Sequence, residues 1–322
     1  MTATLRLTVS MAVASFLGLA VVPLVTTRAD RLNLLILIFL GILLAQSWNL
    51  LAGFAGQINL GHAAFFGLGA LTTRLLWLQG LPIALAVPAG GVAALLLGVL
   101  LGAPAFRLRG AYFAIGTLAL AEILRITVGN VLPMISAMPA DYVGRYNLIP
   151  RYYLFLGLAG LCTATAWALN RSRLGYGLLA LREDEDAAEA SGVPTLQHKL
   201  LALSLSTLFA GLAGGAFAFY HASYYYQHPF SPSWTFEALL ITFIGGVGTT
   251  VGPILGAIFY VVVKEVLAVQ LLEIHLLIFG GIFILMVLLL PGGLIQAATR
   301  LHGWLPSGGN SRQGRPRAGS EG

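Results

Sequence analysis

The sequence carries little charge for its length. Only 9% of its 322 residues are Asp, Glu, Lys or Arg, whereas 58% are hydrophobic. Ordinary soluble domains carry roughly 25% charged residues. Several apolar runs reach the roughly 20 residues that a helix needs to cross a bilayer core. The composition therefore predicts a membrane protein and argues against a soluble domain.

The sequence also lacks the residues of a catalytic or metal centre. Its single cysteine, Cys162, excludes an internal disulfide, and its only lysines, Lys199 and Lys264, do not lie in a GxxxxGK[ST] phosphate loop. HExxH, CxxC and GxSxG motifs are missing, and the six histidines are scattered. We therefore expect no enzyme activity, no metal site and no cofactor in this chain.

Apolar runs divide the chain into ten predicted membrane-spanning helices. Two of them are weak, because Gln57, Asn59 and His62 open one and Gly245-Gly246 interrupts the other, and either can be a broken or re-entrant helix. The prediction is an all-α, polytopic bundle of about 8–10 transmembrane helices. The predicted spans are residues 7–25, 32–55, 58–79, 82–105, 111–131, 152–169, 200–221, 236–250, 252–272 and 274–291.

Basic residues set the predicted orientation, since Lys and Arg accumulate in cytoplasmic loops. With ten spans and a cytoplasmic N-terminus, eleven basic residues fall on the cytoplasmic side, four fall outside and three lie within spans. Both termini are then cytoplasmic. The net charge of +6 is spread over loop ends, which argues against nucleic-acid binding. The eleven are Arg6, Arg107, Arg109, Arg171, Arg173, Arg182, Lys199, Arg300, Arg312, Arg315 and Arg317.

The predicted membrane domain covers residues 1–302. Residues 303–322 are rich in Gly, Ser, Pro and Arg, which predicts a disordered, basic cytoplasmic tail. The segment 180–194, ALREDEDAAEASGVP, is the one long polar passage between apolar runs and holds five acidic residues. Gly192 and Pro194 are stop signals, so the passage predicts a helix of about ten residues that docks on a neighbour. A solvated loop is the alternative.

Two glycine-rich segments, 53–69 and 245–256, are the predicted places of discontinuous helices. In the first, Gln57, Asn59 and His62 are candidates for lining a translocation pathway, and hydrogen bonding between helices is the alternative. In the second, the candidates for hinge or close packing are Gly245, Gly246, Gly248 and Gly252.

Charges within spans are few. Glu122 and Arg125 lie three residues apart, near enough to pair on one helix face. We expect a structural pair, with a substrate site as the alternative.

Six stretches together resemble the membrane permease subunits of ABC importers for branched-chain amino acids, the LivM-like group. The resemblance covers roughly residues 49–293. The stretches are GQINLGHAAFFGLGA from Gly56, RLRGAYFAIGTLALAEILR from Arg107, RSRLGYGLLALREDEDAAEASGV from Arg171, HKLLALSLSTLFAGLAGG from His198, FIGGVGTTVGPILGA from Phe243 and LLLPGGL from Leu288.

The resemblance implies a coupling helix that fits a cleft on an ATPase subunit. Such permeases carry an E-A-A-x-x-x-G pattern, and here Asp186-Ala187-Ala188 and Gly192 have that spacing, with Asp in the Glu position. The implied coupling helix covers residues 183–192, in which small alanines permit close seating. The acidic residues Glu183, Asp184, Glu185 and Asp186 are expected to meet basic ATPase residues.

The resemblance also implies the partners: a sister permease subunit, two ABC ATPase subunits that hold ATP and Mg, a soluble substrate-binding protein and surrounding membrane lipid. The expected place is the bacterial inner membrane. Branched-chain or related hydrophobic amino acids are the expected substrates, with urea or short amides as the alternative, since the VLPMISAMPAD stretch from Val131 departs from the family pattern. An ion-coupled secondary transporter and a membrane enzyme are the less favoured classes.

Overall fold

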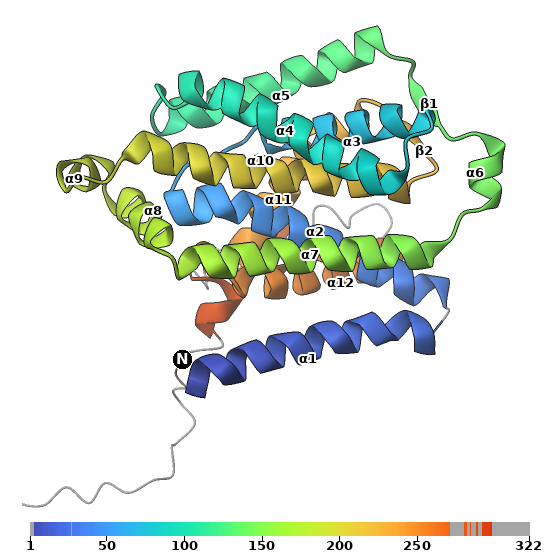
Figure 1. The fold of residues 1–322 in the computed structure, drawn as a ribbon, viewed down its shortest axis with the longest axis horizontal. Helices are drawn as coiled ribbons and strands as arrows, with labels where there is room; N and C mark the ends of the chain where they lie inside the picture. The colour runs from blue at the N-terminus through green and yellow to red at the C-terminus, as the bar shows by residue number, and fades with distance from the viewer. Residues whose placement is uncertain are drawn as a thin grey trace, which may run out of the picture.

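The computed structural model describes residues 3–26, 28–270, 280–281, 284, 288 and 292–297. The chain forms a bundle of helices with one small two-stranded sheet (Figure 1). In chain order the elements are α1 (Ala3–Val25), α2 (Ala29–Ala55), α3 (His62–Leu78), α4 (Ile83–Ala105), α5 (Ala111–Val131), β1 (Ile135–Ala137), α6 (Ala140–Gly144), α7 (Leu148–Asn170), α8 (Arg173–Glu183), α9 (Glu185–Ala190), α10 (Thr195–Tyr220), β2 (Ser223–Tyr225), the 3₁₀ turn η1 (His228–Phe230), α11 (Pro232–Gly245) and α12 (Gly252–Gln270).

The predicted all-α bundle is confirmed, and nine of the ten predicted spans coincide with helices α1 to α5, α7 and α10 to α12. Five of these, α2, α4, α5, α7 and α10, are long and apolar enough to cross a membrane. The two weak spans are shorter than predicted, since α3 begins only at His62 and α11 ends at Gly245. The tenth predicted span, 274–291, lies largely outside the described residues, and the tail 303–322 lies wholly outside them.

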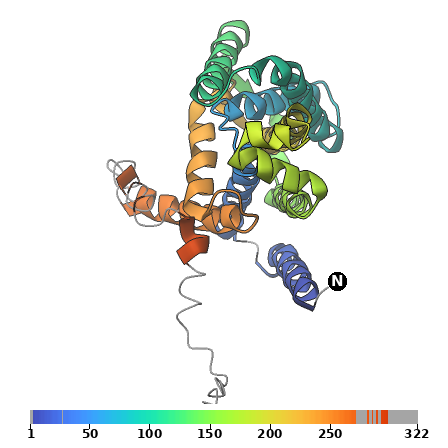
Figure 2. The same cartoon turned by 90° about the vertical axis from the view of Figure 1, so that its left-hand side faces the viewer.

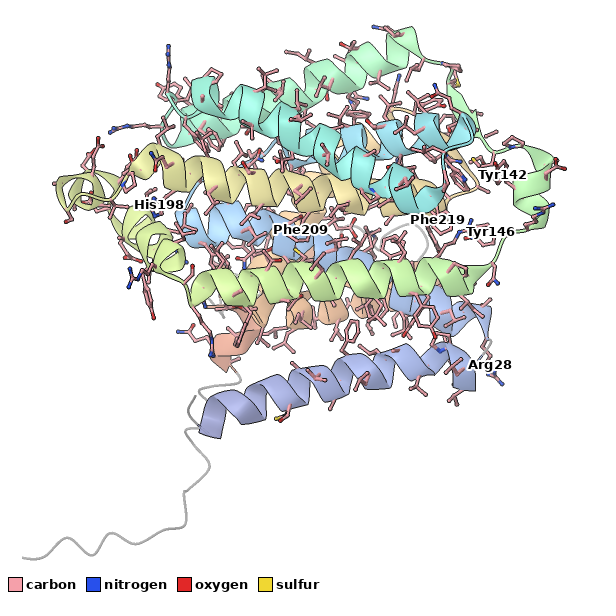
Figure 3. All side chains as sticks on the ribbon, viewed as in Figure 1. Arg28, Tyr142, Tyr146, His198, Phe209 and Phe219 are labelled. Carbon is pink, nitrogen blue, oxygen red and sulfur yellow. The ribbon has the colours of Figure 1, made fainter. Side chains whose placement is uncertain are left out.

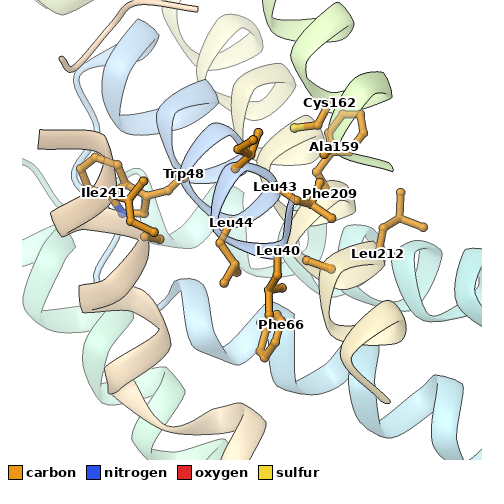
Figure 4. Packing of buried hydrophobic residues seen from close by; sticks show 14 of the residues in the cluster. Leu40, Leu43, Leu44, Trp48, Phe66, Ala159, Cys162, Phe209, Leu212 and Ile241 are labelled. Carbon is orange, nitrogen blue, oxygen red and sulfur yellow. The ribbon is translucent and has the colours of Figure 1, made fainter. Parts of the chain in front are cut away.

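Helix α2 is the centre of the bundle. Its most apolar window is 83% buried, against 17% for α5 at the edge. It packs against α7, α10, α11 and α12. In Figure 4 side chains from three of these helices, Cys162, Phe209 and Ile241, surround Leu43 and Trp48 of α2. Cys162 is therefore a core residue, as its apolar surroundings in the sequence predict.

Glycines let α3, α4 and α10 approach closely. A Cβ on Gly69 of α3 would collide with the backbone of Gly211 in α10, and a Cβ on Gly90 of α4 would meet the Gly69 carbonyl. Gly98 of α4 faces Thr207 across the contact between α4 and α10. Lipid supplies no hydrophobic force between helices, so close backbone contact of this kind is what holds a membrane bundle together.

The two ends of the bundle differ in what they carry. Helices α8 and α9 project at one end, which we call the α9 end, and Figure 2 views the bundle from there. The opposite end, the sheet end, carries α6 and the antiparallel pair β1 and β2, in which Ser136 lies opposite Tyr224. Figure 3 places His198 at the α9 end and Arg28, Tyr142 and Tyr146 at the sheet end.

The glycine contact predicts a specific loss of stability. Gly211→Leu puts a side chain where α10 meets the backbone of α4, and overpacking typically costs about 1–3 kcal/mol. We expect a lower thermal unfolding temperature in mild detergent. Gly157→Leu is the matched control, because a Cβ on Gly157 in α7 has open space around it. Equal unfolding temperatures for the two variants would contradict close packing at Gly211.

Candidate functional site

The acidic passage forms a short, well-capped helix. Asp184 is the N-cap of α9, and its carboxylate accepts from the Ala187 N–H at 3.0 Å. At the other end Gly192 has φ +85°, and the Val193 N–H donates to the Ala188 carbonyl at 3.0 Å. This is the αL stop that favours glycine. The helix has six residues where the sequence predicts about ten, because Asp184 interrupts the helical run that begins in α8.

Two ion pairs hold α9 against the bundle. Glu185 pairs at 2.6 Å with Lys199 of α10, which is only 3% exposed, and Asp186 pairs at 3.3 Å with Arg109 in the connection between α4 and α5. Removing one partner of a buried pair costs about 3–5 kcal/mol, whereas exposed pairs contribute about 0–1 kcal/mol. The buried pair of Glu185 with Lys199 therefore contributes more to holding α9 in place than the exposed pair of Asp186 with Arg109.

The alanines of α9 face opposite ways. Ala188 is 4% exposed and packs on the chain itself, so it does not lie on a free seating face as the sequence-based hypothesis expects. Ala187 is exposed, as are Glu183 and Glu189. Glu185 and Asp186 already have partners within the chain, so the surface that α9 offers to another protein centres on Ala187 and Glu189.

A first helix break lies inside the bundle, between α2 and α3. The chain turns back at Gly56, where φ is +70°, and His62 then lies beside Ser47 of α2, with 2.8 Å between Nε2 and Oγ. Ser47 precedes Ala55 by eight residues, so α3 begins about 12 Å inside the end of α2. The Trp48 indole donates to the Asn59 carbonyl at 2.8 Å.

Threonines from two further helices pair with the backbone of this break. The Leu60 N–H donates to Thr117 of α5 at 3.1 Å, and the Ala63 N–H donates to Thr235 of α11 at 2.9 Å. Away from water every backbone polar group needs a partner within the protein. These side chains allow the helix to be interrupted at that depth.

A second break lies between α11 and α12 and is also hydrogen-bonded to α2. Asn49 accepts from the Gly248 N–H at 2.8 Å and donates to the Thr249 carbonyl at 2.9 Å. One turn earlier, Gln46 donates to the Thr250 carbonyl at 2.6 Å. Both α2 side chains are fully buried. Gly246 and Gly248 have φ of +126° and +78°, which L residues rarely adopt.

The remaining two glycines of this break make close contacts. A Cβ on Gly245 of α11 would collide with the backbone of Gly252 in α12, so close packing is shown for both. A hinge motion at these glycines stays a prediction.

The three predicted pathway residues have different surroundings. Asn59 and His62 are each 1% exposed. His62 bonds Ser47 of α2, which supports its alternative role in hydrogen bonding between helices, whereas the Asn59 side chain accepts from the Gly61 N–H within the break itself. Gln57 is half-buried and remains the candidate for lining a pathway.

The sequence analysis did not identify Gln46, Ser47 and Asn49 as residues that bond the helix breaks. A sequence pattern could have pointed to them, since AQSWN is a polar interruption of an otherwise apolar span. Nothing in the sequence shows which segments these residues contact.

Two ion pairs lie within the predicted spans. Glu122 and Arg125 of α5 pair along one helix, as their spacing predicts. Lys264 of α12 pairs at 3.2 Å with Glu237 of α11 instead of with its neighbour Glu265. Each pairing reduces the cost of holding a charge at membrane depth.

The sheet end buries two arginines among aromatic rings. Arg74 is fully buried, donates to the His221 carbonyl at 2.6 Å and lies 4.8 Å from the Tyr224 ring centroid. Arg151 lies 3.8 Å from the Tyr146 ring centroid. Within the described residues, His, Cys, Asp and Glu form no group that could hold a metal ion.

The sequence of this chain also matches a known family. Residues 31–287 match the family model of the branched-chain amino acid transport system, permease component. The chain belongs to this family. It is a permease component of ABC transport and a multi-pass membrane protein.

Curated relatives of the permease fall into two groups. It is 32% identical to the high-affinity branched-chain amino acid transport system permease protein LivM of Escherichia coli strain K12, over 79% of its own length and 67% of the relative. It is 24% identical to the probable LivM of Methanocaldococcus jannaschii, over 63% and 66% of the two chains. It is also 33% identical to the autoinducer 2 import system permease protein LsrC of Enterobacter sp. strain 638, over 46% and 43%.

The second break predicts that Asn49 matters more for stability than Gln57. Asn49→Leu keeps the side-chain size but leaves the Gly248 N–H and the Thr249 carbonyl without their partner, at a cost of about 1–3 kcal/mol for such a buried group. We expect a lower unfolding temperature in detergent. The matched change Gln57→Leu should keep that temperature and weaken uptake instead. A wild-type unfolding temperature for Asn49→Leu would show that α2 does not hold the second break.

Proposed function

We propose that the permease is the membrane-spanning subunit of an ATP-driven importer and that α9, with the end of α8, is its docking element for an ATPase subunit. The observation that carries the proposal is the fixed geometry of α9. The helix is capped at both ends, tied to α10 through Lys199, and presents Ala187 at the surface. A rigid projecting helix with a small exposed residue suits a cleft on a partner protein, because little conformational entropy is lost on binding.

The proposed orientation places the α9 end in the cytoplasm. Five basic residues, Arg28, Arg31, Arg74, Arg145 and Arg151, lie toward the sheet end. Six lie in or beside the connections at the α9 end, namely Arg107, Arg109, Arg171, Arg173, Arg182 and Lys199. An excess of Lys and Arg marks the cytoplasmic side. ATP is available there, so the docking element and its energy source fall on the same side. Both termini are then cytoplasmic.

The proposed assembly contains a sister permease subunit, two ABC ATPase subunits holding ATP and Mg, and a soluble binding protein that delivers substrate at the sheet end. Helix α5 is the proposed contact with a second membrane subunit, because only 17% of its most apolar window is buried in this chain. Branched-chain or related hydrophobic amino acids are the proposed substrates, supported by the family and by the LivM relatives. Autoinducer 2 is the second candidate substrate, supported by the LsrC match, which covers 46% of the chain.

The first experiment purifies the tagged permease from its native membrane in mild detergent and identifies bound proteins by mass spectrometry. We expect a second permease and phosphate-loop ATPases. The purified assembly is then placed in liposomes with its binding protein, and uptake of leucine, autoinducer 2 and urea is compared. Uptake by the permease alone, without ATP, would replace the proposal with an ion-coupled transporter.

A substitution on α9 tests the docking surface. Ala187→Arg places a long charged side chain on the exposed face of α9, and we expect loss of the co-purifying ATPases and of ATP-driven uptake. Ala29→Arg is the control, since it makes the same change at an exposed residue at the start of α2. Both variants should reach the membrane in normal amounts. Wild-type recovery of ATPases with Ala187→Arg would exclude α9 as the docking element.

A further inference from the structure

Arg182 connects the docking element to the centre of the bundle. It lies in the last turn of α8, and its Nη1 donates to the Gly53 carbonyl of α2 at 2.7 Å. Gly53 belongs to the last turn of α2, where carbonyls have no partner within the helix and a positive charge is favoured. Only Asp184 separates α8 from α9, so a displacement of α9 acts on Arg182 through a one-residue joint.

Two glycines, Gly56 and Gly248, leave room for this arginine, and a third, Gly53, lets the Gly248 loop approach α2. A Cβ on Gly56 would lie 3.3 Å from the Arg182 backbone, and a Cβ on Gly248 would collide with the Arg182 guanidinium. A Cβ on Gly53 would collide with the Asn49 side chain and lie 2.9 Å from the Gly248 nitrogen. One guanidinium therefore touches the end of α2 and the loop between α11 and α12 together, where side chains larger than hydrogen would keep them apart.

Both helix breaks start at this point. The first begins at Gly56, directly after α2, and the second contains Gly248, which Asn49 of α2 holds. The rest of the Arg182 side chain is exposed, so it does not belong to the packed core. A purely structural cap would need to touch only α2. Arg182 touches both segments whose rearrangement would open or close an interrupted bundle.

We propose that Arg182 is the positioning residue that transmits movement of the docking helix to the two helix breaks, through the Gly53 carbonyl and the Gly248 loop. The inference rests on the proposed docking of ATPases at α9. Movement of α9 would pull on Arg182 and change the spacing between the end of α2 and the loop between α11 and α12. Uptake and ATP hydrolysis then stay linked only while Arg182 holds both segments.

The test uses the complete assembly in liposomes and measures uptake and ATP hydrolysis in the same vesicles. Arg182→Gln removes the charge, and we expect uptake per ATP hydrolysed to fall by about 2- to 30-fold, the range for residues that carry coupling between sites. Arg182→Lys keeps a charged donor and should recover part of the ratio. Arg173→Gln is the matched control, because Arg173 is exposed on the same helix, and it should leave the ratio unchanged.

A second readout follows the first break directly. Gln57→Cys introduces a half-buried thiol, while the native Cys162 is fully buried. In the otherwise wild-type assembly we expect ATP with vanadate to change the rate of maleimide labelling at residue 57. With Arg182→Gln the assembly should still bind its ATPases, but the labelling rate should no longer respond to ATP.

The outcomes separate this inference from the proposed function. Wild-type vesicles without ATP-dependent uptake would overturn both. Coupled uptake in wild type, with an unchanged ratio and labelling response in Arg182→Gln, would overturn only the role of Arg182. A lower unfolding temperature with an unchanged ratio would make Arg182 a structural cap and would equally overturn it.

Discussion

The fold depends on hydrogen bonds that α2 supplies to backbone interrupted inside the membrane. Helices α3 and α11 each stop short of a full span, which exposes amide and carbonyl groups at a depth where no water can pair with them. Buried Gln46, Ser47 and Asn49 lie within about one turn of α2; Gln46 and Asn49 bond the second break, and Ser47 bonds His62 of the first. Without Gln46 and Asn49 the second break would lose the partners of its Gly248 N–H and its Thr249 and Thr250 carbonyls. The first break is held by α2 together with Thr117 and Thr235.

Small residues and polar residues have separate roles in this bundle. Glycines such as Gly69 and Gly211 bring α3, α4 and α10 into backbone contact, which gives van der Waals packing where lipid gives no hydrophobic force. Polar side chains hold the interrupted segments at fixed positions along α2. Helices α11 and α12 also pack on α2 through apolar residues such as Ile241 and Val261, so these hydrogen bonds add to core packing.

The same helix joins the interior to the surface that would meet an ATPase. The end of α2 accepts from Arg182, and two turns further in its side chains hold the α11–α12 loop. On the far side of α9, Lys199 ties the helix to α10, which packs on α3 and α4. Helix α9 and the end of α8 therefore have one buried ion pair with α10 and one hydrogen bond with the end of α2.

The sequence by itself determined the membrane bundle, nine helix positions and the place of the acidic helix, because apolar run length and stop residues are local properties. The tertiary structure decided what depends on distant segments. In the structure α9 has six residues and Ala188 is buried. Glu185 pairs with Lys199, and His62 is hydrogen-bonded to Ser47. Partners some 200 residues apart, such as Asn49 and Thr249, are set by packing. No local pattern encodes which backbone groups a helix break leaves unpaired or which side chain reaches them.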